Sequence, residues 1–121
     1  MYFPVSAWFT AFVLTVVVEG PIVWSLLRRL EPDLRRLGPL VVLANLASHP
    51  AVWFIFTQLL VVGTLSYTLV TEGWAVAVEA ILYLVAIRGI TARRALGTSL
   101  AANAASYVAG LLIGRLWPGL F

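Results

Sequence analysis

The sequence predicts an all-α membrane protein with four transmembrane helices, arranged as two tandem-duplicated helical hairpins. Three observations predict this fold class. Hydrophobic residues make up 62% of the 121-residue chain, charged residues make up only 11%, and the same polar residues recur at the same spacing in both halves. A soluble domain averages about 45–50% apolar and about 25% charged residues. A chain this small could not hide so much apolar surface from water, so the lipid bilayer is its expected partner.

Each predicted span is an apolar run of about 20 residues, which is the length that an α-helix needs to cross the hydrocarbon core. The four runs cover about Pro4–Leu27, Gly38–Val62, Tyr67–Ile87 and Ala95–Trp117. Together they take up nearly the whole chain. Residues 1–121 are therefore expected to form a single transmembrane domain.

Arginines gather in two of the predicted loops and give the spans a direction. RRLEPDLRR joins the first two spans, and RGITARR joins the last two. With four spans these loops lie on the same side, and short loops rich in arginine stay cytoplasmic. We therefore expect an integral protein of the cell (inner) membrane with both termini outside. This topology also explains the basic composition, so nucleic acid is not an expected partner.

An internal repeat is visible at polar positions. A shift of 58 residues places the ANLAS of 44–48 on the ANAAS of 102–106, and a shift of 60 places Glu19 on Glu79. Apolar segments resemble one another in any case, so agreement at polar residues is the stronger evidence. Both copies run in the same direction, which implies a pseudo-two-fold axis along the membrane normal, as in the parallel repeats of some transporters. The predicted copies cover 4–62 and 67–117.

The repeated polar residues are expected to share one depth in the bilayer. Glu19, Asn45, Glu79 and Asn103 each lie nine residues from an arginine at the cytoplasmic end of their span. At a helical rise of about 1.5 Å per residue, each is about 13 Å from the arginine level. We therefore predict that the two acids and two amides face each other near the middle of the bilayer.

Two further titratable residues extend this predicted layer outward. His49 follows Asn45 by four residues and shares its face, and Glu72 precedes Glu79 by two helical turns. An ionised acid at the centre of a helix costs about 2.5–3.5 kcal/mol on insertion scales, so intramembrane acids usually have a function. The candidate residues for binding an ion or a substrate are Glu19, Asn45, His49, Glu72, Glu79 and Asn103. The serines beside them, including Ser48 and Ser106, are interpreted mainly as packing residues.

A metal site is one use of these residues. Two carboxylates and one imidazole suit several divalent ions, so Glu19, His49 and Glu79 are candidate metal ligands, and the cofactor is otherwise unknown. Pro21 and Pro50 follow the candidate residues Glu19 and His49 and are expected to kink their helices. The chain has no H-E-x-x-H, phosphate-binding loop or haem-attachment motif, so no catalytic residue is predicted.

The preferred functional hypothesis is a small transporter or channel whose mid-membrane polar site binds a proton or a metal cation. One alternative is an accessory subunit of a larger membrane complex that uses the polar layer, or His49, to bind a partner or a pigment. Another alternative is an intramembrane enzyme acting on a lipid-like substrate. Four helices are few for a transport pathway, so a homodimer is also considered.

Overall fold

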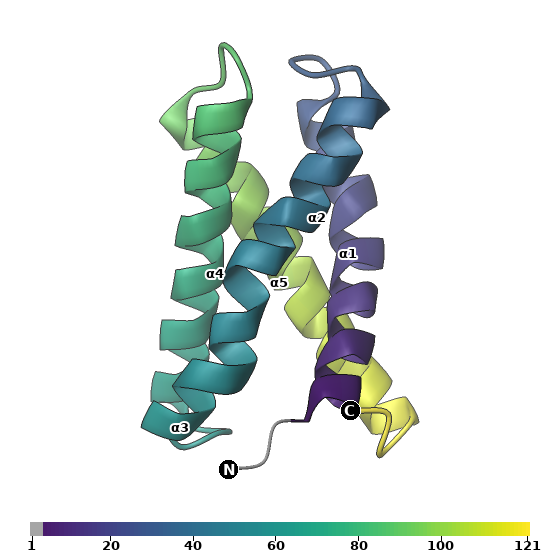
Figure 1. The fold of residues 1–121 in the computed structure, drawn as a ribbon, viewed down its shortest axis with the longest axis vertical. Helices are drawn as coiled ribbons and strands as arrows, with labels where there is room; N and C mark the ends of the chain where they lie inside the picture. The colour runs from purple at the N-terminus through teal and green to yellow at the C-terminus, as the bar shows by residue number, and fades with distance from the viewer. Residues whose placement is uncertain (1–3) are drawn as a thin grey trace.

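The computed structural model describes residues 4–121, which form α-helices and one short π-helical segment (Figure 1). In chain order the elements are α1 (Val5–Leu27), α2 (Leu34–Ala51), the π-helical η1 (Val52–Phe56), α3 (Thr57–Leu59), α4 (Leu65–Ala86) and α5 (Ala92–Leu116). Because α2, η1 and α3 continue as one span, four helices are long and apolar enough to cross a membrane. No strand occurs among these residues. The prediction of an all-α chain with four spans is confirmed.

Side-chain caps decide where the second and fourth spans begin. Asp33 accepts a hydrogen bond from the backbone N–H of Arg35 at 2.9 Å, and Thr91 accepts one from that of Arg94 at 3.2 Å. Asp and Thr are strong N-cap residues because their side chains satisfy free N–H groups of the first turn. Both helices therefore begin a few residues before the long apolar runs. Arginines that hydropathy assigns to the loops lie in their first turns.

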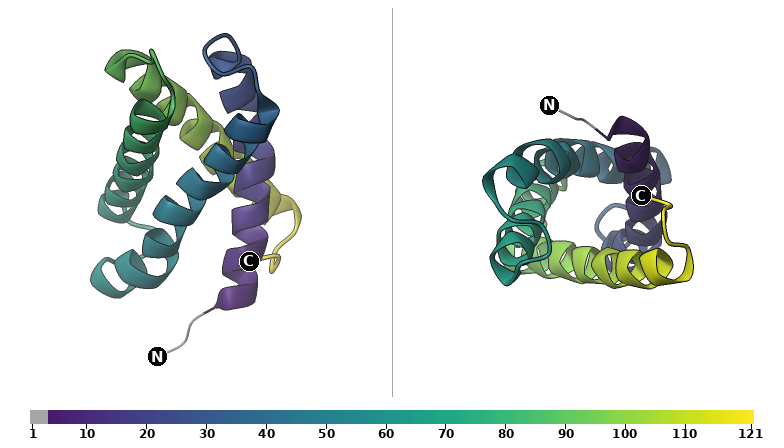
Figure 2. Two further views of the ribbon diagram at one scale, coloured as in Figure 1. Left: turned by 45° about the horizontal axis from the view of Figure 1, so that its top comes forward. Right: turned by 90° about the horizontal axis from the view of Figure 1, so that it is seen from below.

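The four spans form a ring in which each helix packs against two neighbours. Helix α1 contacts α2 and α5, and α4 contacts the same two helices on the opposite side. The right-hand view of Figure 2 shows the ring end-on, from below. The connections 28–33 and 87–91 lie together at one end, here called the arginine end (Figure 1). The connection 60–64, the start of α1 and the end of α5 lie at the other end, here called the terminal end.

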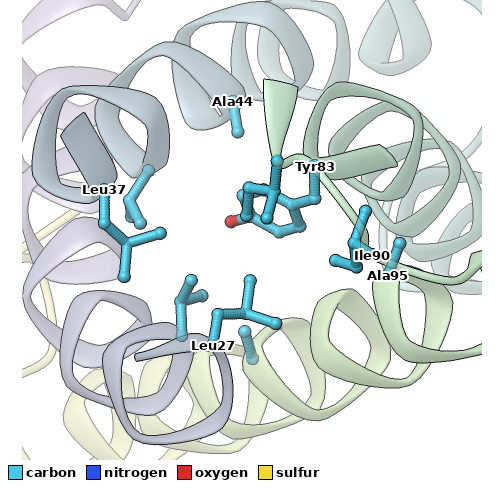
Figure 3. Close-up of a cluster of buried hydrophobic side chains, with 10 residues drawn as sticks. Leu27, Leu37, Ala44, Tyr83, Ile90 and Ala95 are labelled. Atoms are coloured by element: carbon cyan, nitrogen blue, oxygen red, sulfur yellow. The ribbon is translucent and has the colours of Figure 1, made fainter. Parts of the chain in front are cut away.

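Apolar side chains fill the centre of the bundle toward the arginine end. Figure 3 shows them pointing inward from the surrounding helices. We call this cluster the apolar plug: Val23, Leu27, Leu37, Val41, Ala44, Tyr83, Ile87, Ile90, Ala95 and Ala102. On the outside of the bundle many large apolar side chains are exposed, up to 80% for Val85. Apolar groups on both the inside and the outside of a bundle are typical of a protein surrounded by lipid.

The helix type changes after Pro50 but not at Pro21. Pro50 lies at the end of α2, and the chain continues as the π-helical η1 from Val52. A proline has no N–H to donate inside a helix, and short π-helical segments often occur near functional sites. Pro21 lies inside α1, which continues as an α-helix to Leu27. The irregular stretch is therefore next to His49.

Candidate functional site

The two predicted acids are buried in the interior of the bundle. The side chain of Glu19 on α1 is 0% exposed, and that of Glu79 on α4 is 1% exposed. Asn45 on α2 and Asn103 on α5 are buried beside them. A carboxyl group in such a position needs polar partners, because burying an unpaired one is costly. The hydrogen bonds of each acid therefore define the site.

Glu19 connects α1 to both of its neighbours. One carboxyl oxygen, Oε2, accepts a hydrogen bond from Asn45 Nδ2 at 3.0 Å. The other oxygen, Oε1, accepts one from Ser106 Oγ at 2.8 Å. The donors come from α2 and from α5. A single acid thus ties three of the four spans together.

Glu79 makes the corresponding bonds from α4. Its Oε2 accepts a hydrogen bond from Asn103 Nδ2 on α5 at 2.7 Å, and its Oε1 accepts one from Ser48 Oγ on α2 at 3.0 Å. The acids and amides therefore converge inside the bundle, as the sequence predicted. We call the set the polar layer: Glu19, Asn45, Ser48, Glu79, Asn103 and Ser106.

The asparagines hold their amide groups in place with a second bond. Asn45 Nδ2 also donates to the Val41 carbonyl at 3.0 Å, and Asn103 Nδ2 donates to the Ser99 carbonyl at 2.9 Å. Each acceptor lies one turn back on the same helix. An amide nitrogen has two hydrogens, so both are used and each asparagine is a fixed donor to its glutamate.

The serine hydroxyls, by contrast, have two acceptors for one hydrogen. Ser106 Oγ lies 2.8 Å from Glu19 Oε1 and 3.1 Å from the Asn103 carbonyl. Ser48 Oγ lies 3.0 Å from Glu79 Oε1 and 3.5 Å from the Asn45 carbonyl. A hydroxyl that donates to the carbonyl can accept a hydrogen bond from a protonated acid instead. The same geometry thus accommodates both the ionised and the protonated form of each glutamate.

Ser48 and Ser106 contribute more to the site than their sequence positions predict. The sequence predicts mainly a packing role, yet each serine is a direct partner of a buried acid in the opposite half of the chain. A signal was present in the sequence, because both serines belong to the repeated A-N-x-A-S motif. Only the packing of α2 against α4, and of α5 against α1, makes their partners apparent.

Every partner of the two acids is electrically neutral. In the described part of the chain, no arginine or histidine forms an ion pair with Glu19 or Glu79, and their hydrogen-bond donors are amides and hydroxyls. The arginines lie near the two ends of the bundle. No charged side chain among the described residues therefore offers either acid a counter-charge.

His49 and Glu72 lie outside this hydrogen-bonded set. The ring of His49 is half-buried between Phe12 and Trp53, and its Nε2 lies 3.5 Å from Thr15 Oγ1. Its Nδ1 is buried and has no partner among residues 4–121. Glu72 is also half-buried. Neither residue bonds directly to Glu19 or Glu79.

A cavity at the terminal end links these two residues to the polar layer. Its volume is about 270 Å³. Its walls include His49 and Glu72 together with Asn103 and Ser106 of the polar layer. On the other side of the layer lies the apolar plug, where the hydroxyl of Tyr83 is buried without a partner among the described residues. The two sides of the polar layer thus differ in access.

The predicted metal site receives no support from this arrangement. Within residues 4–121, no group of three or more His, Cys, Asp or Glu side chains is placed to hold a metal ion. Glu19, His49 and Glu79 as metal ligands therefore stay a prediction.

No family model, curated protein or solved structure matches the chain. Its function therefore has to be inferred from the chemistry of the polar layer and of the cavity.

Proposed function

We propose that this chain is a small membrane transporter or channel that binds a cation at the polar layer, and that the cation is a proton. The observation that carries the proposal is the pair of buried acids with only neutral partners. A charged carboxylate in a lipid-surrounded bundle is costly without a counter-charge. Glu19 and Glu79 are the proton-binding groups, and Asn45 and Asn103 orient them.

The hydrogen-bond geometry favours a proton over a metal ion. Ser48 and Ser106 can each change from donor to acceptor when the neighbouring acid is protonated. Such a change needs only the rotation of a hydroxyl and no movement of a helix. A divalent ion would need several ligands around one point, and the described residues offer no such group.

Access from one side supports transport over a purely structural layer. The cavity reaches Asn103 and Ser106 from the terminal end, and the apolar plug closes the arginine end. A site open to one side and closed to the other is what one state of a transport cycle requires. Intramembrane hydrogen bonds average only about 0.6 kcal/mol, so stability alone is a weak reason to keep two acids there.

We also propose that the two hairpins arose by tandem duplication. The bonds Glu19–Asn45 and Glu79–Asn103 join equivalent positions within each hairpin. Ser106 and Ser48 supply the equivalent bonds between hairpins. Both hairpins then have the same orientation, with the arginine end in the cytoplasm and the terminal end outside the cell membrane, because short arginine-rich loops stay cytoplasmic.

The test is proton flux into liposomes that contain the purified protein, driven by a potassium diffusion potential and followed with an internal pH dye. Wild type is expected to exceed protein-free liposomes, and Glu19→Gln and Glu79→Gln are each expected to reduce the flux at least about tenfold, in line with the loss of an essential proton-transfer group. Glu31→Gln is the matched control, because it removes a carboxyl group from the arginine end.

Two results would overturn the proposal. One is wild-type flux no greater than that of empty liposomes. The other is unchanged flux in both Glu19→Gln and Glu79→Gln. Treatment with a chelator separates the proton from a metal ion, since proton flux through the layer is expected to persist after metal removal.

A further inference from the structure

The cavity contains an acid that the polar layer does not use. Glu72 lines the cavity, and within residues 4–121 its carboxyl group receives no hydrogen bond, whereas Glu19 and Glu79 each accept two. Carboxyl groups away from water normally have hydrogen-bond donors. A molecule in the cavity that carries such donors can supply them to Glu72.

Two threonines in the cavity wall add further acceptors. Thr68 Oγ1 donates its hydrogen to the Thr64 carbonyl at 3.3 Å, and Thr71 Oγ1 donates to the Tyr67 carbonyl at 2.8 Å. A hydroxyl has one hydrogen and two lone pairs. While that hydrogen is used in the helix, the lone pairs of each threonine oxygen stay available to accept a hydrogen bond from a ligand. A carboxyl group and two such hydroxyls select a ligand that is rich in N–H or O–H donors.

Apart from Thr15, His49, Asn103 and Ser106, the remaining wall is apolar and aromatic. Trp53, Tyr67 and Tyr107 are among its residues, with aliphatic side chains between them. Within residues 4–121 no arginine lines the cavity, so the described chain gives Glu72 no fixed counter-charge there. Aromatic rings attract cations through their electron-rich faces. The volume of about 270 Å³ lies just below the usual range of small-molecule sites, about 300–1,000 Å³.

We propose that this cavity binds a small protonated amine with an apolar body. The ammonium N–H groups donate to Glu72 and to the threonine hydroxyls, and the apolar body packs against Trp53 and Tyr67. A metal ion fits less well, because three ligating side chains are not grouped there in the described chain. Movement of the amine across the membrane rests on the proposed function, whereas binding of the amine in the cavity does not.

The experiment measures binding to the full chain in lipid nanodiscs through tryptophan fluorescence, since Trp53 is in the wall. Three probes of similar size are titrated: benzylammonium, benzyltrimethylammonium, which is charged but has no N–H donor, and benzyl alcohol, which is neutral. Benzylammonium is expected to give a saturable signal with the lowest Kd. Glu72→Gln removes the charged partner and is expected to raise the Kd for benzylammonium about 10- to 100-fold. Thr71→Val is expected to raise that Kd about two- to tenfold.

Matched controls separate this site from the polar layer. Glu31→Gln removes an acid from the arginine end and is expected to bind benzylammonium like wild type. Glu19→Gln is expected to lose proton flux but to keep binding, so failure of the one proposal is distinguishable from failure of the other. Size-exclusion elution and helical circular dichroism check that each variant is folded. If Glu72→Gln does not fold, the Kd of Thr71→Val for benzylammonium tests the site in its place.

Three outcomes would overturn the inference. The first is no saturable binding of benzylammonium to wild type. The second is equal affinity for benzylammonium in wild type, Glu72→Gln and Thr71→Val. The third is an affinity for benzyl alcohol or benzyltrimethylammonium that matches that of benzylammonium, because the site would then not need the charge in the first case, or the N–H donors in the second.

Discussion

The bond between Glu79 and Asn103 allows the charge state of the polar layer to be measured. The two groups lie 2.7 Å apart, which is the shortest of the four bonds to the buried acids. A double-mutant cycle combines Glu79→Met, which removes the acceptor at similar volume, with Asn103→Leu, which removes the donor. The coupling free energy isolates the pair from the other contacts that each single change disturbs.

The expected magnitude depends on whether Glu79 is neutral or ionised. Hydrogen bonds between neutral groups inside membranes average about 0.6 kcal/mol and reach about 1.7 kcal/mol. Hydrogen bonds to charged groups contribute about 1.5–3 kcal/mol. We expect the lower range, because the layer has no fixed positive charge and a bound proton makes the acid neutral. Each single variant is expected to cost more than the coupling, since it leaves one buried hydrogen-bonding atom of the other group without that partner.

The assay is reversible unfolding of the four proteins in mixed micelles by increasing the fraction of denaturing detergent, followed by helical circular dichroism. Thr91→Ala combined with Glu79→Met is the control cycle. Thr91 caps α5 twelve residues before Asn103, the partner of Glu79, and is therefore about 18 Å from the bonded pair along the helix. That cycle is expected to be additive within about 0.3–0.5 kcal/mol. A Glu79–Asn103 coupling inside the same limits would refute the hydrogen-bonded layer, and one of about 2–3 kcal/mol would refute the neutral acid.

The remaining predictions concern the two sides of the polar layer. Tyr83→Phe is expected to leave the protein equally stable or to stabilise it by about 1–3 kcal/mol, because the hydroxyl it removes is buried and has no partner among the described residues. The same detergent titration measures this change. A loss of stability would show that the hydroxyl has a partner. Ser106→Ala is expected to reduce proton flux by about 10- to 100-fold, since Glu19 loses the hydroxyl that can both donate and accept. Thr57→Ala is its control, because among the described residues that hydroxyl bonds only to the Trp53 carbonyl one turn earlier in the same span. Equal flux in the two variants would contradict the role of Ser106.

Much of the fold could be predicted from composition and spacing. Four apolar runs predicted four spans, and the nine-residue distance from arginine to Glu19, Asn45, Glu79 and Asn103 placed the polar groups at one depth. The boundaries of α2 and α5 were less accurate, because hydropathy detects apolar residues, whereas the caps at Asp33 and Thr91 determine where the helices begin.

The sequence by itself determined that these helices lie in lipid and that each must direct one polar residue away from it, because an unpartnered acid or amide is costly in hydrocarbon. It did not determine which residues pair, since helical spacing fixes the face of a helix but not its neighbours. The ring order α1–α2–α4–α5 decided that Ser48 meets Glu79 and Ser106 meets Glu19. It also placed Glu72 and His49 beside a cavity on the terminal side of the polar layer.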